Sequence, residues 1–256
     1  MQEELLHIFP LHLRETLQKV TMKENTLEEI RIRIGQPVIF HMENEEWYLK
    51  KETGRLERSQ VNAYCATKED IKSMVKFISS YSLYAYEDEM KRGFITMQGG
   101  HRIGVAGQVV MDGGKVLSLS NIYFLNIRVA REKRGCAKDI IPYLIHGNRI
   151  YNTLFVSPPG IGKTTYLRDA IRILSNGSDR LHGMKISIID ERSEIAACRQ
   201  GIPQNDIGIR SDVLDGCLKS FGMLLMLRSM APQIIAVDEI GSREDCRAME
   251  QAIYSG

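Results

Sequence analysis

A loop with the residues of a phosphate-binding site lies beyond the middle of the chain. It follows the apolar residues 153–156 and has the sequence Ser157-Pro158-Pro159-Gly160-Ile161-Gly162-Lys163-Thr164-Thr165. A strand, a glycine loop and a helix in this order form a P-loop, in which backbone N–H groups and the helix N-terminus surround nucleotide phosphates. Lys163 would reach the β- and γ-phosphate oxygens there, and the Thr164 hydroxyl would coordinate Mg²⁺. Residues 159–165 are therefore the predicted phosphate site.

Two acidic residues that follow another apolar run support this prediction. Residues 233–237 have the composition of a buried strand, and Asp238 and Glu239 come directly after it. At the end of such a strand Asp238 would hold Mg²⁺ through water, and Glu239 would polarise the water that attacks the γ-phosphate. Alone, the loop at Ser157, where the usual pattern has glycine, also fits a turn that caps an ordinary helix. Its combination with the two carboxylates favours a site that hydrolyses ATP or GTP.

A third apolar run, residues 185–189, ends in further carboxylates. Asp190 follows it at once, and Glu191 and Glu194 come within the next four residues. Grouped carboxylates repel one another unless a cation or ordered water lies among them, which favours a catalytic role for Asp190. For Glu191 and Glu194 a second interpretation is equally good, because acidic residues also favour the first turn of the helix expected near 191–199.

The composition is that of an ordinary globular protein. The 256 residues are 43% hydrophobic and 26% charged, and a net charge of +2 gives no global field that would attract nucleic acid or anionic lipid. The apolar runs are far shorter than the roughly 20 residues that cross a bilayer. Five cysteines without paired spacing argue against a disulfide framework or zinc site and favour a reducing compartment. We expect a cytoplasmic protein without nucleic-acid partners, which reaches membranes only through other proteins.

Two regions with different patterns make up the chain, and we place their boundary after residue 148. Residues 1–148 combine helical spacing with alternating, strand-like stretches, which predicts an α+β domain with helices on one face of its sheet. Residues 149–256 alternate strands and helices, which predicts an α/β domain with a parallel sheet that binds ligands at the carboxyl ends of its strands. The expected strands are 153–157, 185–189 and 233–237, and the expected helices are 163–175, 191–199, 215–230 and 243–254.

A basic run near the boundary has two interpretations. It contains Arg128, Arg131, Lys133 and Arg134, and such a run is usually a solvated surface. Near a nucleotide site, an arginine from an adjacent domain or subunit instead stabilises the charge that the γ-phosphate carries during transfer. Arg128 and Arg131 lie on an expected strand and are the better candidates for this catalytic role.

Taken together, these motifs resemble those of the type II/type IV secretion ATPase superfamily. More closely, the chain resembles a sporulation family of endospore-forming bacteria, over essentially its whole length. The resemblance is carried by residues 157–165, 188–195, 212–217, 227–228 and 231–241. It places Asp190 in the Asp box of the superfamily, Glu239 in the Walker B region, and Arg128 and Arg131 in the arginine-bearing junction.

The resemblance implies a RecA-like P-loop ATPase domain preceded by a sensor-like, PAS-like α+β domain. It also implies ATP and Mg²⁺ as ligands and assembly into a ring, usually a hexamer. The ring would energise a secretion-like channel between mother cell and forespore through integral membrane components of that channel. The His box of the superfamily would follow residue 256, so we expect the sequence to be a piece of a longer chain.

Two other functions fit the same motifs. A RecA-like ATPase that depends on nucleic acid would need a basic groove along the phosphates, and the near-neutral net charge argues mildly against it. A nucleotide-controlled assembly scaffold would bind ATP without productive turnover. Hydrolysis and its response to single-stranded DNA distinguish the three functions.

Overall fold

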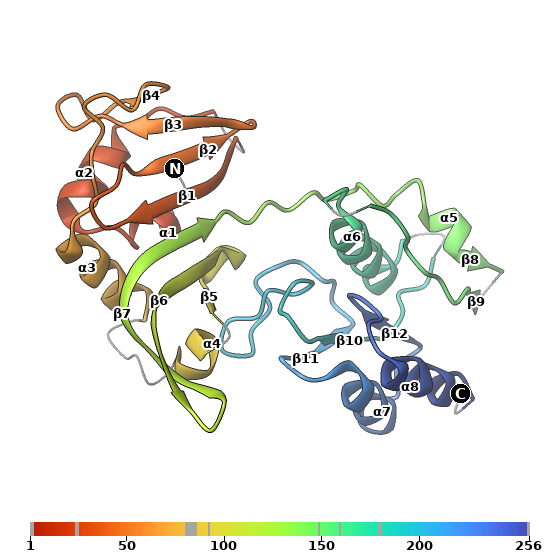
Figure 1. Cartoon of the computed structure of the whole chain (residues 1–256). Coiled ribbons are helices and arrows are strands. Elements are labelled where there is room, and N and C mark those ends of the chain that lie inside the picture. The colour runs from red at the N-terminus through yellow and green to blue at the C-terminus, as the bar shows by residue number, and fades with distance from the viewer. Residues whose placement is uncertain are drawn as a thin grey trace. The chain divides into compact units, whose positions relative to one another are not determined.

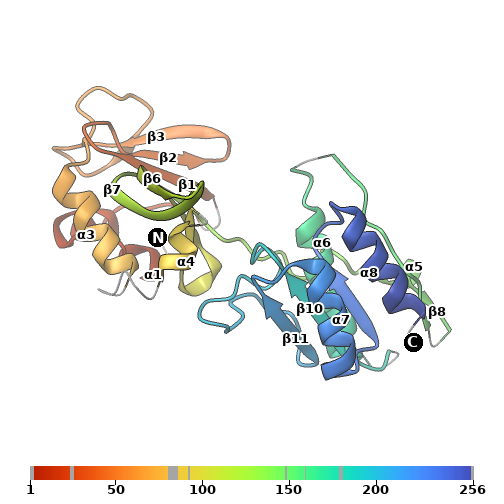
Figure 2. The same ribbon diagram turned by 60° about the horizontal axis from the view of Figure 1, so that its bottom comes forward.

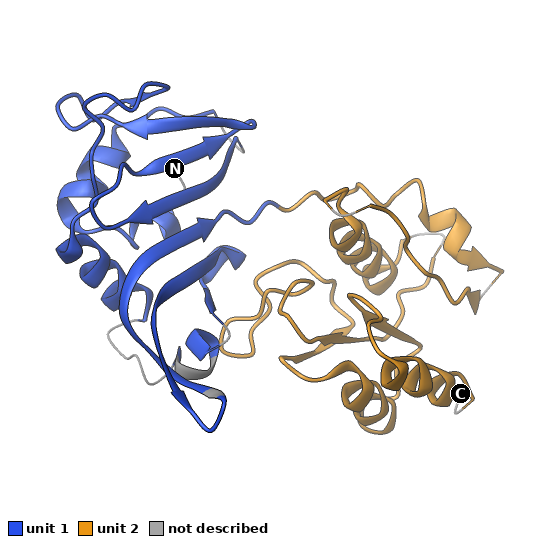
Figure 3. Cartoon of the chain, in the orientation of Figure 1, with its two compact units in different colours: residues 1–131 blue, residues 132–256 orange. Residues whose placement is uncertain are grey.

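The computed structural model divides the chain into two compact units, Met1–Arg131 and Glu132–Gly256 (Figures 1 and 3). The structure describes residues 3–23, 26–79, 86–91, 93–147, 149–158, 160–178 and 181–254. The units divide after residue 131, earlier in the chain than the boundary expected after residue 148. The reason is that Ala137, Ile141 and Leu144 bury their side chains in the core of the second unit.

The first unit is an antiparallel sheet of seven strands in the order β4-β3-β2-β1-β7-β6-β5. The strands are β1 (Leu27–Arg33), β2 (Ile39–Met42), β3 (Glu45–Leu49), β4 (Leu56–Glu57), β5 (Phe94–Thr96), β6 (Arg102–Asp112) and β7 (Lys115–Arg128). The helices are α1 (Glu3–Leu6), α2 (Leu11–Gln18), α3 (Lys68–Ile78), α4 (Glu87–Lys91) and the 3₁₀ turn η2 (Gln98–Gly100).

Alternation along the strands of the first unit decides which face of the sheet the helices cover. Ile30 and Ile32 of β1 are fully buried, whereas Arg31 between them is exposed. Ile30 lies opposite Ile127 of β7, and both pack in one core with apolar residues of α1, α2 and α3, such as Met74. Figure 2 shows α1 and α3 on one face of this sheet. This is the α+β arrangement that the sequence predicts.

The second unit contains a parallel sheet of three strands in the order β11-β10-β12. Its strands are β10 (Ile186–Asp190), β11 (Ser211–Asp215) and β12 (Ile234–Val237), and a separate short hairpin pairs β8 (Ile145–His146) with β9 (Arg149–Ile150). The helices are α5 (Ile141–Leu144), α6 (Lys163–Asn176), α7 (Lys219–Met230) and α8 (Arg243–Tyr254).

Helices cover both faces of this parallel sheet. Ile188 of β10 packs with residues of α6 on one face, and Ile189 packs with Met223 of α7 and Ala248 of α8 on the other. Gly222 permits this close approach of α7, because a Cβ there would lie 2.6 Å from the Ile189 Cγ2 atom. The sheet with helices on both faces confirms the predicted α/β class.

One predicted strand is wrong. Residues 151–158, which include the expected strand 153–157, have no regular structure and pair with none of the described strands. Phe155 packs partly against the core, but Leu154 and Val156 are 75% and 82% exposed. The alternation is strand-like, but a strand also requires a neighbouring ladder for its N–H and C=O groups.

Two further predictions in the second unit need correction. The helix expected near 191–199 is a series of turns, because Ser193 and Ala197 have left-handed φ angles of 53° and 49°. The helix expected near 215–230 begins only at Lys219, and β11 lies before it. The strand was missed because its sequence, Ser-Asp-Val-Leu-Asp, lacks the apolar run of the central strands.

Candidate functional site

The phosphate loop leads into α6 at Lys163, as the sequence predicts. Gly160 and Gly162 have φ angles of 78° and 97°, which residues with a Cβ rarely adopt. Gly162 is the N-cap of α6 and has no side chain that could cap the helix. The first-turn N–H groups of a helix have no partner within the helix, so this end of α6 suits an anion. Pro159 lies outside the described residues.

The ammonium of Lys163 contacts oxygen atoms of its own loop. Nζ donates to the carbonyl oxygens of Ser157 and Pro158, at 2.9 and 3.2 Å, and lies 3.5 Å from the Ser157 hydroxyl. Lys163 therefore contacts the loop although Ser157 stands where the usual pattern has glycine. Lys163, the N-terminus of α6 and the Thr164 hydroxyl in its first turn form a donor set that fits phosphate oxygens and Mg²⁺.

Carboxylates gather at the carboxyl ends of β10 and β12. The two strands are parallel neighbours with Ile189 opposite Val237, so Glu191 and Asp238 follow adjacent strand ends. Lys219 lies between them, with Nζ 2.6 Å from a Glu191 oxygen and 3.5 Å from Asp238 Oδ1. The structure thus adds a buried cation, Lys219, beside the predicted Asp238 and brings Glu191 to the same cation.

Glu239 lies at the surface of this acidic edge. Its carboxylate is 2.9 Å from the Arg192 guanidinium, and the two side chains are 48% and 57% exposed. The backbone N–H of Glu239 donates to Asp238 Oδ1 at 2.9 Å. Because a pair this exposed contributes little free energy, Arg192 leaves the Glu239 carboxylate accessible to water.

Burial and neighbouring charges shift the pKa values of Asp238 and Lys219. It raises the pKa of Asp238, and the charge of Lys219 and the N–H of Glu239 offset only part of that rise. Burial alone would lower the pKa of Lys219, but its hydrogen bond to Glu191 and the nearby charges of Asp238, Glu191 and Glu239 raise it above the usual value. Lys219 is therefore a stable cation.

Asp190 has a structural task that the sequence did not reveal. Its side chain is fully buried. Oδ1 accepts the N–H of Glu194 at 2.7 Å, and Oδ2 accepts those of Ile195 and Ala196 at 3.0 and 2.8 Å. Burial raises the pKa of Asp190 in spite of these three donors. In this geometry Asp190 holds the loop after β10, and its expected role in catalysis stays a prediction.

Asp190→Asn is expected to destabilise the second unit by about 1–3 kcal/mol, because an amide NH₂ would face backbone donors that now share two acceptor oxygens. A lower denaturant midpoint without nucleotide would show the effect. Asp212→Asn, at an exposed position of β11, is the matched control and should change the midpoint little. An unchanged midpoint for Asp190→Asn would mean that the three N–H bonds do not hold the loop.

The helix that follows the phosphate loop contacts the same edge of the sheet. Arg168 of α6 donates from Nε to the carbonyl of Ile195 and from Nη2 to that of Glu194, both at 2.6 Å. These carbonyls belong to the loop that Asp190 holds. The N-terminal half of α6 is thereby fixed at the carboxyl end of β10, where open α/β sheets bind their ligands.

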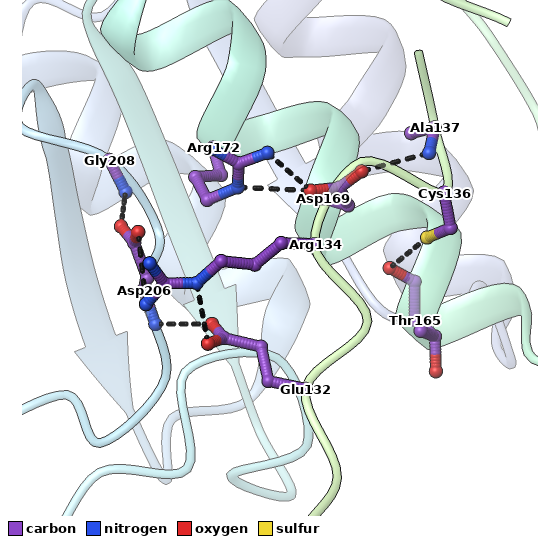
Figure 4. A network of polar contacts seen from close by, with 9 residues as sticks. All are labelled: Glu132, Arg134, Cys136, Ala137, Thr165, Asp169, Arg172, Asp206 and Gly208. Atoms are coloured by element: carbon purple, nitrogen blue, oxygen red, sulfur yellow. Dashed lines mark hydrogen bonds and ion pairs between the residues drawn. The ribbon is translucent and has the colours of Figure 1, made fainter. Parts of the chain in front are cut away.

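A second network joins α6 to the segment at the start of the unit (Figure 4). Asp169 accepts the backbone N–H of Ala137 at 2.8 Å and two bonds from Arg172, at 2.9 and 2.7 Å. Burial would raise the pKa of Asp169, but these donors lower it below its usual value. Cys136 Sγ lies 3.8 Å from the carbonyl of Thr165, in the first turn of α6.

Acidic and basic side chains extend this network toward the loop before β11 (Figure 4). Arg134 pairs with Glu132 at 2.8 Å and with Asp206 at 3.4 Å, and Glu132 also accepts the N–H of Asp206. Arg134 thus belongs to the second unit as part of a salt-bridge cluster. This favours a structural role for that part of the basic run.

The two candidate arginines of the first unit differ. Arg131 donates to the carbonyls of Thr26 and Leu27 and pairs with Glu28 at 3.4 Å, so its guanidinium is held inside the first unit. Arg128 is exposed on β7 and lies opposite Glu29 of β1 and Arg102 of β6. Strand pairing thus brings Arg102 next to Arg128.

The fold is similar to that of solved ATPases. Similar solved structures are the ATPase DotB of Legionella pneumophila (TM-score 0.52, 16% identity) and the pilus retraction motor PilT with bound ADP (TM-score 0.59, 14% identity). The matches cover 96% and 98% of this chain but 61% and 64% of those chains, less than two thirds of either. At this identity the likeness concerns the fold alone.

The chain belongs to the family described as "Sporulation stage III, protein AA", whose sequence profile matches residues 1–256. It is 41% identical over 254 residues to "Stage III sporulation protein AA" of Bacillus subtilis (strain 168), which covers 99% of this chain and 78% of that protein. It is also 25% identical over 248 residues to "Uncharacterized protein ycf45" of Porphyra purpurea, covering 96% of this chain and 37% of that protein. These matches confirm the family that the motifs indicate.

Within the described part of the chain, no helix combines the length and apolar character needed to cross a membrane. Nor do three or more His, Cys, Asp or Glu side chains gather there in a group that could hold a metal ion.

Proposed function

We propose that this chain is the ATP-hydrolysing motor subunit of a secretion-like channel required in endospore formation. The observation that carries the proposal is the attachment of α6 to the end of β10 through Arg168, at 2.6 Å from two carbonyl oxygens. This attachment places the helix that starts at Lys163 at the edge of the sheet where Asp238 and Glu239 follow β12. A phosphate site and two carboxylates at one sheet edge are the parts that ATP hydrolysis requires.

Each residue of the site has a proposed task. Lys163 and the N–H groups of residues 160–165 bind the phosphates, and Thr164 and Asp238 hold the metal, Asp238 through water. When bound, Mg²⁺ neutralises charge on the phosphates. Glu239 polarises the attacking water. These tasks match the atoms that each side chain presents.

We further propose assembly into a ring, with integral membrane components of the channel as partners. In such a ring Arg128 is the better candidate for stabilising charge on a γ-phosphate, because Arg131 already bonds three residues of its own unit. Arg128 is exposed, so its guanidinium can reach a neighbouring subunit without giving up buried contacts.

Release of phosphate from ATP, measured with and without single-stranded DNA, tests this proposal. We expect Mg²⁺-dependent hydrolysis that single-stranded DNA does not stimulate, since the net charge of +2 provides no strong attraction for it. Stimulation of tenfold or more by DNA would instead support the nucleic-acid-dependent ATPase. Tight ATP binding without turnover would support the assembly scaffold.

A further inference from the structure

We propose that Lys219 is a positioning residue of the ATP site, whose ammonium orients the Asp238 carboxylate for Mg²⁺ and joins the ends of β10 and β12. The proposal rests on the proposed function, because it concerns the same site. Nothing in the sequence motifs marks Lys219. Its position between Glu191 and Asp238 is visible only in the folded chain.

The surroundings of Lys219 are unusual for a lysine. It is the first residue of α7, where the helix dipole disfavours a cation, and its side chain is only 5% exposed. Burial of an ammonium is costly unless carboxylates pair with it. Glu191 supplies one such carboxylate, at 2.6 Å, and Asp238, itself 4% exposed, supplies the other, at 3.5 Å. A lysine that is buried and lies at a helix N-terminus goes against two local preferences of its residue type, and such exceptions often mark functional sites.

The two contacts of Lys219 have separable consequences. The hydrogen bond to Glu191 is the shorter one and satisfies the carboxylate that follows β10. The contact with Asp238 involves Oδ1, the same oxygen that accepts the N–H of Glu239. Together the ammonium and the N–H hold Oδ1 in place and thereby set the direction of the other carboxylate oxygen, Oδ2.

Electrostatics supports the same task. Asp238 and Glu239 follow one strand, Glu191 follows its neighbour, and Asp245 of α8 also feels the charge of Lys219. Glu239 also pairs with Arg192, but once the Lys219 ammonium is removed, the carboxylates of Glu191 and Asp238 lose the cation between them and repel each other. Without Lys219 we expect Asp238 to turn toward water, so that it no longer meets the metal that accompanies the nucleotide.

Three variants separate positioning from simple stabilisation. Lys219→Met leaves the buried Asp238 and the partly exposed Glu191 without their cation and is expected to lower stability. Lys219→Met combined with Glu191→Gln removes the closer ion pair and leaves Asp238 as the one carboxylate that loses its contact with Lys219, so it should cost less stability than Lys219→Met alone. Lys219→Arg keeps the charge. Lys185→Met, at an exposed position just before β10 on the opposite edge of the sheet, is the matched control.

The measurement is the affinity for a fluorescent ATP analogue in Mg²⁺ and in EDTA, together with the thermal midpoint of each variant. The wild type and Lys185→Met should bind more tightly with Mg²⁺. The double variant should fold and bind the analogue in EDTA as tightly as the wild type does. In Mg²⁺ its affinity should be about tenfold lower than that of the wild type, the effect of about one hydrogen bond to a charged group. Lys219→Arg should recover part of the lost affinity.

A double variant that folds and keeps the full gain from Mg²⁺ would overturn the inference, and Lys219 would then only stabilise the fold. A wild type that binds equally well in Mg²⁺ and in EDTA would overturn it as well. Failure of the proposed function gives a different result, namely no binding by the wild type or binding that Lys163→Ala does not weaken.

Discussion

Lys163→Ala is expected to weaken ATP binding by about a hundredfold or more. The ammonium now contacts the Ser157 and Pro158 carbonyls, at 2.9 and 3.2 Å, and would exchange these oxygens for those of the β- and γ-phosphates. Two charge-assisted hydrogen bonds to phosphate account for a loss of this size, since each contributes about 1.5–3 kcal/mol. Titration with a fluorescent ATP analogue measures the loss directly.

The same substitution should leave the fold intact. The Ser157 and Pro158 carbonyls that Lys163 contacts lie in a loop at the surface, where water replaces the ammonium. Lys185→Ala, at an exposed lysine of the same unit, should bind the analogue as the wild type does. Wild-type affinity in Lys163→Ala would show that residues 157–165 are an ordinary helix-capping turn.

Features that depend on neighbouring residues alone were predicted well. The helix expected at 243–254 matches α8, and the one expected at 163–175 matches α6 to within one residue. The glycine requirement of the phosphate loop was likewise local, since Gly160 and Gly162 have positive φ angles. Helical periodicity and backbone preference are both written into short stretches of sequence.

Features that depend on distant residues were missed. Lys219 has no signal in its own neighbourhood, because its partners Glu191 and Asp238 lie 28 residues before it and beyond the end of α7. The task of Asp190 depends on the turns at 194–196, which a left-handed Ser193 makes possible. Both were hidden because a buried charge can be understood only once its partners are known.

The strand expected at 153–157 shows the limit of a local apolar run as a signal. Phe155 packs partly on the core while Leu154 and Val156 are exposed, so burial alternates here as it does in a strand. What is absent among the described strands is a hydrogen-bonded neighbour for this segment. A pattern of side chains can therefore indicate a strand without establishing its partner.

Glu239→Gln is expected to retain ATP binding and to lower turnover by about a hundredfold to ten-thousandfold, the range that a positioned general base contributes. Glutamine keeps the shape of Glu239 and removes the charge that polarises water. Analogue affinity and the steady-state release of phosphate, measured on one sample, separate binding from turnover. Glu244→Gln, at an exposed position in the first turn of α8, is the matched control and should hydrolyse ATP normally.

The ion pair with Arg192 makes this prediction more specific. If the pair with Arg192 restrained Glu239, the loss of Arg192 would raise turnover, but an exposed pair of this kind contributes little and Arg192→Gln should change turnover less than a few-fold. Normal hydrolysis by Glu239→Gln would contradict the assignment of the base and return that role to Asp190. Its carboxylate would then first have to leave three backbone N–H groups, so a loop rearrangement after β10 would accompany each turnover.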